Sequence, residues 1–469
     1  MTKALLIYNS RLLDENMDTP GAVLSVDGKI RAVFQGYFTN ANTVSTLAKS
    51  VLTEDGYGDD CVLELFDAAG LTLTPAFIDM HVHFRYPGQT QKEDLTTGMQ
   101  AAAAGGFGTV VAMPNTTPVV SSLETSLQIQ KEACEGKLGN MFQTVSITEN
   151  FDGKTTSHLD FLDSKHVPVI SEDGRDVEST SVMLEGMQKA AEKGIVVSCH
   201  CEDTALALKA REYRKIAFDL MKQYEIPTWS QDKKNLENVQ ENVIEAIDKN
   251  LSQADEILRL AENVATERNI ELATEAGCRI HLAHVSTAEC LSYIENAKEM
   301  YGENVTCEIT PHHLSLSGNH APNNFAVVNP PLRNDEDRLC IIDAIKRGVV
   351  DCISTDHAPH TLEDKANGSP GFTGLETAFG VCYSVLHGEI PDTKLSQLMS
   401  ANPARILGLN KGVFKPEYDA DFTIFDPDSK WTVDSSIFYS KGTATPFEGK
   451  ELTGKIRALF IGGRLVLEM

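Results

Sequence analysis

The feature that most constrains the fold is a repeated alternation, from residue 71 onward, of short apolar segments with longer helical or polar stretches. Apolar runs of this length are typical of buried parallel strands, and the intervening stretches are long enough to return the chain to the same edge of a sheet. The strand-like segments span residues 76–84, 109–115, 142–148, 167–173, 195–201, 279–286, 304–313 and 351–360. Eight such units predict an α/β fold, a TIM (β/α)8 barrel over residues 73–410.

Short β-like segments at both ends of the chain flank the predicted barrel. Those near the start break at Asp-Gly pairs, and after Gly408 the sequence returns to short alternating or apolar runs. We expect residues 1–72 and 411–469 to pair as one small β-sandwich domain. The stretch from Asp203 to about Gly277 is longer than a minimal barrel needs, and we expect it to hold helices and an insertion at about 205–250.

Charge and composition exclude several classes of function. The formal net charge is −26, and no cluster of Lys or Arg offers the positive surface that nucleic acid requires. No run of 18 uncharged apolar residues and no apolar leader is present, so we expect no membrane partner and a cytoplasmic location. The ten cysteines include no C-x-x-C pair, which predicts reduced and mostly buried thiols.

Candidate metal ligands gather at the predicted carboxyl ends of the strands, the rim where TIM-barrel enzymes place their active sites. The first two form a His-x-His pair, and because side chains alternate along a strand, both imidazoles face the same side. The candidates are His81, His83, Asp173, His200, His284 and Asp356. Four imidazoles and two carboxylates suit Zn²⁺, and less selectively Co²⁺ or Mn²⁺, and six ligands predict two metals.

Other polar residues near these positions have several interpretations. His281 lies three residues before His284, so on an extended strand it faces the other way, and we expect it to pack on the outside of the barrel. Asp79 shares the face of His81 and is either a carboxylate that supports the ligands or a buried structural residue. For His312, a role in orienting the site and a structural hydrogen bond are equally open.

The segments around these residues resemble the class I dihydroorotase family of the metal-dependent amidohydrolase superfamily. The resemblance rests on HVHFRYPG from His81, MPNT, SEDG, CHCED, HLAHVSTAE, ITPHHL, NPPLR, DHAPH and GLETAFG, in the order of the family. It covers essentially the whole chain apart from residues 45–65 and 205–250. The activity implied is the reversible cyclisation of N-carbamoyl-L-aspartate to L-dihydroorotate, the third step of pyrimidine synthesis.

The resemblance also implies roles for individual residues. The six candidates carry over as ligands of Zn²⁺, with Asp173 bridging where hydantoinases and other dihydroorotases use a carboxylated Lys, and with Glu172 as its rival one residue away. Asp356 would serve as general base and then as general acid. The residues implied to bind the substrate carboxylate are Arg85, Asn115 and His360, and those implied to line the pyrimidine ring are Asn329, Pro370 and Gly371.

Two alternatives remain from the sequence, another cyclic amidohydrolase such as a hydantoinase or allantoinase, and a non-catalytic partner subunit of aspartate transcarbamoylase. The segments HVHFRYPG, MPNT and DHAPH favour dihydroorotase over the first, and the presence of all six ligand positions argues against the second. The family resemblance further implies a small-molecule substrate, a homo-oligomer, here a dimer, and an association with aspartate transcarbamoylase.

Overall fold

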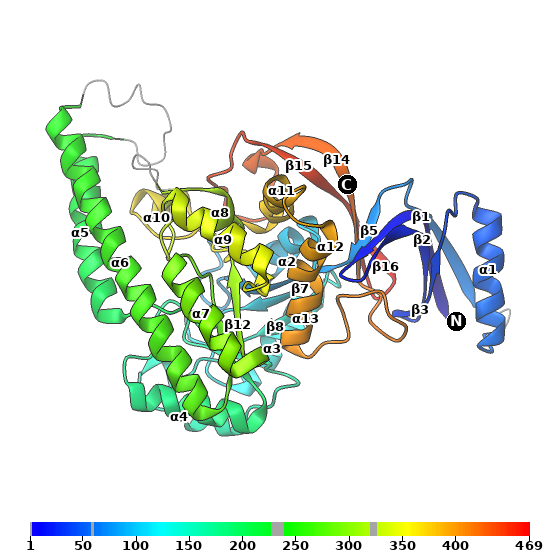
Figure 1. Ribbon diagram of the computed structural model, residues 1–469, viewed down its shortest axis with the longest axis horizontal. Coiled ribbons are helices and arrows are strands. Elements are labelled where there is room, and N and C mark those ends of the chain that lie inside the picture. The colour runs from blue at the N-terminus through cyan, green and yellow to red at the C-terminus, as the bar shows by residue number, and fades with distance from the viewer. Residues whose placement is uncertain (1, 58–60, 227–238, 319–325) are drawn as a thin grey trace.

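The computed structural model describes residues 2–57, 61–226, 239–318 and 326–469. A barrel occupies the middle of the molecule, with a β-sheet and helix α1 (Ala41–Glu54) at one end and two long antiparallel helices at the other (Figure 1). None of the described helices is both long and apolar enough to cross a membrane.

Parallel strands form the barrel in two arcs, β6-β7-β8 and β9-β10-β11-β12-β13. Isolated parallel bridges, Val82 to His357 and Val145 to Ile170, join the arcs. The strands are β6 (Phe77–Val82), β7 (Phe107–Ala112), β8 (Asn140–Gln143), β9 (Val169–Ser171), β10 (Val196–Cys199), β11 (Arg279–Leu282), β12 (Val305–Ile309) and β13 (Cys352–Ile353). Each lies within or overlaps one predicted segment, which confirms the barrel fold.

Helices alternate with the barrel strands and cover them. α2 begins at a capping box made by Asp94 and Thr97, and α4 ends at Gly194, whose φ of 67° is the left-handed conformation that glycine favours. The helices are α2 (Leu95–Ala104), α3 (Leu123–Cys134), α4 (Thr180–Lys193), α7 (Ala288–Tyr301), α8 (Pro311–Ser315), α9 (Asp335–Arg347), α10 (Leu362–Ala366), α11 (Leu375–Leu386), α12 (Asp392–Ser396) and α13 (Asn402–Leu407).

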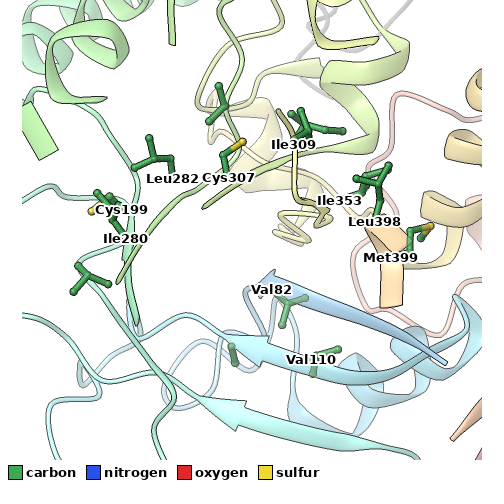
Figure 2. Packing of buried hydrophobic residues seen from close by; sticks show 14 of the residues in the cluster. Val82, Val110, Cys199, Ile280, Leu282, Cys307, Ile309, Ile353, Leu398 and Met399 are labelled. Atoms are coloured by element: carbon green, nitrogen blue, oxygen red, sulfur yellow. The ribbon is translucent and has the colours of Figure 1, made fainter. Parts of the chain in front are cut away.

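The main hydrophobic core lies between strands and helices. Figure 2 shows Val82, Val110, Leu282 and Ile353, which come from different strands, among the buried side chains of this cluster. Each fully buried side chain of this size contributes roughly 1.5–3 kcal/mol relative to exposure. This packing holds the strand ends, and therefore the rim, in fixed positions.

The two chain ends form one eight-stranded sheet in the order β16-β15-β14-β5-β1-β2-β3, with β4 paired to β1. Strand β5 lies between β1 and β14, so it joins the first and last parts of the chain. Both faces of β1 are buried, since Leu6 packs with residues of α1 while Ile7 packs with Phe460. The strands are β1 (Lys3–Asp14), β2 (Met17–Val26), β3 (Lys29–Gln35), β4 (Val62–Asp67), β5 (Thr72–Pro75), β14 (Phe422–Thr432), β15 (Glu451–Ile461) and β16 (Arg464–Glu468).

A helical hairpin projects from the barrel at the end opposite the sheet (Figure 1). It consists of α5 (Thr204–Gln223) and α6 (Glu241–Ala276), which pack side by side. The predicted insertion at about 205–250 runs through α5 and the first part of α6, and its residues 227–238 lie outside the described residues.

Candidate active site

The six predicted ligands meet at one place on the rim, and all are buried. Two groups could each hold a cation, and within each the ligand atoms lie within 4.8 Å of one another. Asp173 belongs to both groups, and the Oδ1 of Asp356 lies 3.1 Å from the Nε2 of His83 and 3.7 Å from that of His81. The groups are His81, His83 and Asp173, and Asp173, His200 and His284.

The backbone at this rim adopts strained conformations. His284 has a φ of 37° and Asp356 a φ of 49°, and Arg85, two residues after His83, has a φ of 57°. Left-handed conformations of residues other than glycine cost about 1–3 kcal/mol and cluster at functional sites. Asp79 stabilises this region because its carboxylate accepts backbone N–H bonds from His81 and from Thr355.

Asp173 and its neighbour Glu172 have different surroundings. The Oδ1 of Asp173 lies 3.3 Å from both His81 Nε2 and His200 Nδ1. Glu172 instead accepts hydrogen bonds from the backbone N–H and the hydroxyl of Thr148, and burial raises the pKa of its carboxyl to about 7. The geometry therefore places Asp173, and not Glu172, in the ligand cluster.

The electrostatics of the cluster couple its acids and bases tightly. Burial opposes protonation of His200, but the Asp173 carboxylate outweighs it and raises the pKa of His200 to about 9. In His81 the same opposition is overcome by Asp173 and Glu308, and its pKa is raised. Burial would raise the pKa of Asp356, yet its hydrogen bond to His83 and the charges of His81 and His83 hold it at about 2. Asp356 is therefore a carboxylate at neutral pH.

The residues present fit divalent cations. Within the described part of the chain, His81 Nε2, Asp173 Oδ1 and His284 Nδ1 are buried and have no hydrogen-bond partner. Buried polar atoms without a partner are costly, and a cation that accepts their lone pairs satisfies them. Imidazole nitrogens and carboxylate oxygens are the donor set of Zn²⁺ and related metals. The cluster is thus able to bind metal.

Glu308 is a residue of the candidate site that the sequence analysis missed. Its Oε1 lies 3.1 Å from His81 Nδ1 and its Oε2 lies 3.1 Å from His281 Nε2. A carboxylate only accepts hydrogen bonds, so His81 donates from Nδ1 and keeps the lone pair of Nε2 for a cation. A charged residue inside the apolar segment at 304–309 is the signal that could have identified it.

The prediction that His281 packs on the outside of the barrel is wrong. Ile280 and Leu282 belong to the hydrophobic cluster of Figure 2, and His281 between them faces the opposite way, toward Glu308. The prediction failed because β11 ends at Leu282 and His284 follows in a left-handed turn, so strand alternation does not extend to His284.

Of the three residues predicted to bind the substrate carboxylate, Arg85 and His360 are in contact with each other, and Asn115 contacts the predicted metal ligands instead. Arg85 donates from Nε to the Pro359 carbonyl at 3.3 Å, and its Nη2 lies 3.2 Å from His360 Nε2. That nitrogen of His360 also lies 2.8 Å from the Pro370 carbonyl oxygen. Burial lowers the pKa of Arg85 to about 10, which leaves it a cation at neutral pH. The structure therefore brings a half-buried positive charge next to the ligand cluster.

Gly371 completes this side of the site. Its φ is 107°, and a Cβ at this position would lie 2.7 Å from that of Ala358. Lys365 links the turn at Gly371 to the segment around Val327, since its Nζ donates to the carbonyls of Gly371 at 2.6 Å and Val327 at 3.2 Å. Lys365 thus holds the turn at Gly371 close to the segment that contains Val327 and Asn329.

The two asparagines have different partners. Asn115 lies 3.0 Å through Oδ1 from His83 Nδ1, and its Nδ2 donates to Asp173 at 2.9 Å, so it belongs to the ligand network. Asn329 donates from Nδ2 to Glu202 at 3.2 Å and accepts a bond from Arg214 at 2.8 Å. Its environment is therefore shared between the barrel and helix α5.

Comparison with known proteins identifies the family. The model of the amidohydrolase family matches residues 72–466, which include the barrel, the six ligand positions and the last strands of the sheet. The chain belongs to the amidohydrolase family. Among the relatives of this amidohydrolase, a dihydroorotase of Clostridium botulinum (strain Eklund 17B / Type B) is 39% identical, over 98% of each chain. A dihydroorotase of Aquifex aeolicus (strain VF5) is 33% identical, over 98% of this chain and 99% of its own.

Solved structures support the fold. An L-hydantoinase (dihydropyrimidinase) from Arthrobacter aurescens superposes with a TM-score of 0.80 at 23% identity, over 99% of this chain and 96% of its own. The dihydropyrimidinase from Brevibacillus agri NCHU1002 gives a TM-score of 0.76 at 21% identity, over 100% and 95%. At these identities the likeness establishes the barrel with its terminal β domain for this amidohydrolase.

Proposed function

We propose that this amidohydrolase is a dihydroorotase, which interconverts N-carbamoyl-L-aspartate and L-dihydroorotate in pyrimidine synthesis. The observation that carries the proposal is the half-buried Arg85, next to His360 and the Pro370 carbonyl, at the edge of a cluster of imidazoles and carboxylates. A guanidinium fork matches the carboxylate that both substrates carry. The dihydroorotases that match nearly the whole chain support the same activity.

The proposed cofactor is a pair of Zn²⁺ ions, with Asp173 as the shared ligand because it belongs to both groups of ligand atoms. When bound, the cations would supply Lewis-acid polarisation of the amide carbonyl and acidify the attacking water. The residues that would hold them are His81, His83, Asp173, His200, His284 and Asp356.

The remaining roles fall to the side chains of the chain itself. Asp356 is ionised at neutral pH, so it can accept a proton from the attacking water and return it to the leaving ring nitrogen. Arg85, Asn115 and His360 would hold the substrate carboxylate. The pyrimidine ring would lie against Asn329 and the Pro370-Gly371 turn.

Parallel assays on one metal-analysed sample test the proposal. Purified protein with measured metal content is given L-dihydroorotate, hydantoin and allantoin, before and after treatment with a chelator and after restoration of Zn²⁺. We expect turnover of dihydroorotate that is lost with the metal and restored with it. A preference for hydantoin or allantoin, or full activity without metal, would contradict the proposal.

The reaction also has a proton balance that can be measured. Ring closure converts a dianion into a monoanion and consumes a proton, so the equilibrium favours dihydroorotate more strongly as the pH falls. The ratio of the two compounds at equilibrium, measured on either side of neutrality, checks this sign.

The expected cytoplasmic location, the homodimer and the association with aspartate transcarbamoylase stay predictions. The ten free cysteines favour a reducing compartment. Sedimentation of the protein alone and mixed with aspartate transcarbamoylase tests the two assemblies.

A further inference from the structure

Helix α5 of the hairpin carries an arginine within its buried stripe. Ala207, Ala210, Ala217 and Met221 are the buried residues of this helix, at a spacing that places them on one face. Arg214 falls between Ala210 and Ala217 on the same face, and its side chain is only 14% exposed. Small neighbours leave room for a long side chain to pass toward the barrel.

The guanidinium of Arg214 reaches a residue of the proposed substrate site. Its Nη1 donates to the Oδ1 of Asn329 at 2.8 Å, while its Nη2 lies 3.5 Å from Asp255 of α6. On the other side of the amide, the Nδ2 of Asn329 donates to Glu202 at 3.2 Å. Because a guanidinium only donates and a carboxylate only accepts, these two partners fix which way the amide faces.

Arg214 also compensates a negative charge at the site. Glu202 lies two residues after the ligand His200, and 9% of it is exposed. A buried carboxylate at this place would repel an anionic substrate, and the cationic Arg214 lies on the other side of the Asn329 amide that Glu202 contacts. An arginine keeps its charge in such surroundings, which a lysine does less reliably.

We infer that Arg214, supplied by the hairpin, is a positioning residue for the anionic substrate, acting through Asn329 and by offsetting Glu202. The amide nitrogen of Asn329 has two N–H groups. Glu202 accepts one, and the second is the donor offered to a carbonyl oxygen of the ring. The inference rests on the proposed function, which assigns Asn329 to the ring. It gives the hairpin a part in substrate binding while the chemistry stays on the barrel rim.

Substitutions on α5 test the inference with the metal-loaded protein. In Arg214→Met we expect the KM for L-dihydroorotate to rise about tenfold, as the loss of one charge-assisted hydrogen bond allows, with kcat and metal content changed much less. Arg214→Lys, which keeps the charge without the fork, should fall between this variant and the parent. The control is Arg211→Met, three residues earlier on the same helix and exposed, which should match the parent.

Two further variants separate positioning from a role in folding the hairpin. In an Asn329→Ala background, Arg214→Met should add little, because both changes remove the same contact. Asp255→Asn removes the ion pair that Arg214 of α5 makes with α6, and it should leave the KM near that of the parent. The inference is overturned by a parent-like KM in Arg214→Met, by an undiminished effect in the Asn329→Ala background, or by Asp255→Asn raising the KM as much as Arg214→Met.

The outcome is distinguishable from failure of the proposed function. A parent that hydrolyses hydantoin and not dihydroorotate refutes the proposed function. The same variants are then compared on hydantoin, and an unchanged KM there overturns the inference as well. A parent active on dihydroorotate with insensitive Arg214 variants overturns the inference alone.

Discussion

Two lysines with largely or fully buried side chains, one at the barrel rim and one beside the terminal sheet, have opposite electrostatic surroundings. Burial lowers the pKa of Lys365 to about 7, assisted by the charges of Arg214 and Arg85. Burial acts the same way on Lys411, but Asp421 and Asp419 overcome it and raise its pKa. The two lysines thus differ in the charges that act on them, since two arginines outweigh the carboxylate of Asp364 at Lys365, whereas two carboxylates dominate at Lys411.

If the rim serves chemistry and the sheet serves stability, changes in the two regions should have separate effects. The largest effect is expected for Asp356→Asn, because the proposed general base is lost and kcat should fall by about 10²–10⁴-fold. The free energy of unfolding should change little. Steady-state kinetics and denaturant unfolding measure the two quantities, with the exposed Asp428→Asn as control. Activity that survives in Asp356→Asn would remove this residue from the proposed chemistry.

A substitution in the core of the terminal sheet should lower stability and leave kcat unchanged. Phe460 is 1% exposed and packs against Phe66 with ring centroids 5.0 Å apart. Phe460→Ala leaves a cavity, and we expect about 3–5 kcal/mol of lost stability. The kcat of the folded fraction at moderate temperature should match the parent. Urea unfolding followed by fluorescence checks the first expectation, and a large drop in kcat with retained structure would show that the regions are coupled.

Glu308 tests whether the interior of the barrel supports the ligands. Glu308→Gln can no longer accept hydrogen bonds from both His81 and His281, so metal affinity should fall by about 10–100-fold. Competition with a metal indicator measures the affinity. Glu303→Gln, exposed just before the same strand, is the matched control. Equal affinities in the two variants would leave Glu308 with a packing role.

The smallest expected effect is a pH dependence of stability with opposite signs for the two lysines. The pKa of Lys365 is below its ordinary value of 10.5 in the folded state, so the unfolded chain binds the extra proton between pH about 7 and 10.5. In that window stability rises with pH by up to about 1.4 kcal/mol per unit.

The Lys411 contribution runs the other way. Its raised pKa gives stability that is present at neutral pH and is lost as the pH rises through the folded value. Unfolding at pH 7 and pH 9 should show a flatter rise of stability in Lys365→Met than in the parent. Lys411→Met should keep the slope of the parent over this range, because Lys411 is protonated in both the folded and the unfolded chain, and it should lose less stability than the parent above pH 10.5. A parent-like slope in Lys365→Met between pH 7 and pH 9 would contradict its lowered pKa, and a parent-like loss of stability in Lys411→Met above pH 10.5 would contradict its raised pKa.

The sequence predicted the barrel and the meeting of the six ligands because both follow from position along parallel strands. It failed at His281, where a turn interrupts strand alternation. Glu308 and Arg214 were missed because their meaning depends on contacts across 227 and 115 residues. Propensity and periodicity describe neighbours within a few residues, so such contacts become visible only once the chain is folded.

The position of β5 also determines how late in synthesis the terminal sheet can be completed. One edge of β5 pairs with β1 early in the chain, but the other edge meets β14 about 350 residues later. At roughly 5–20 residues per second a ribosome needs about 20–70 s to cover that distance. During that interval one edge of β5 has no partner strand, so the nascent sheet exposes backbone groups that a chaperone could shield.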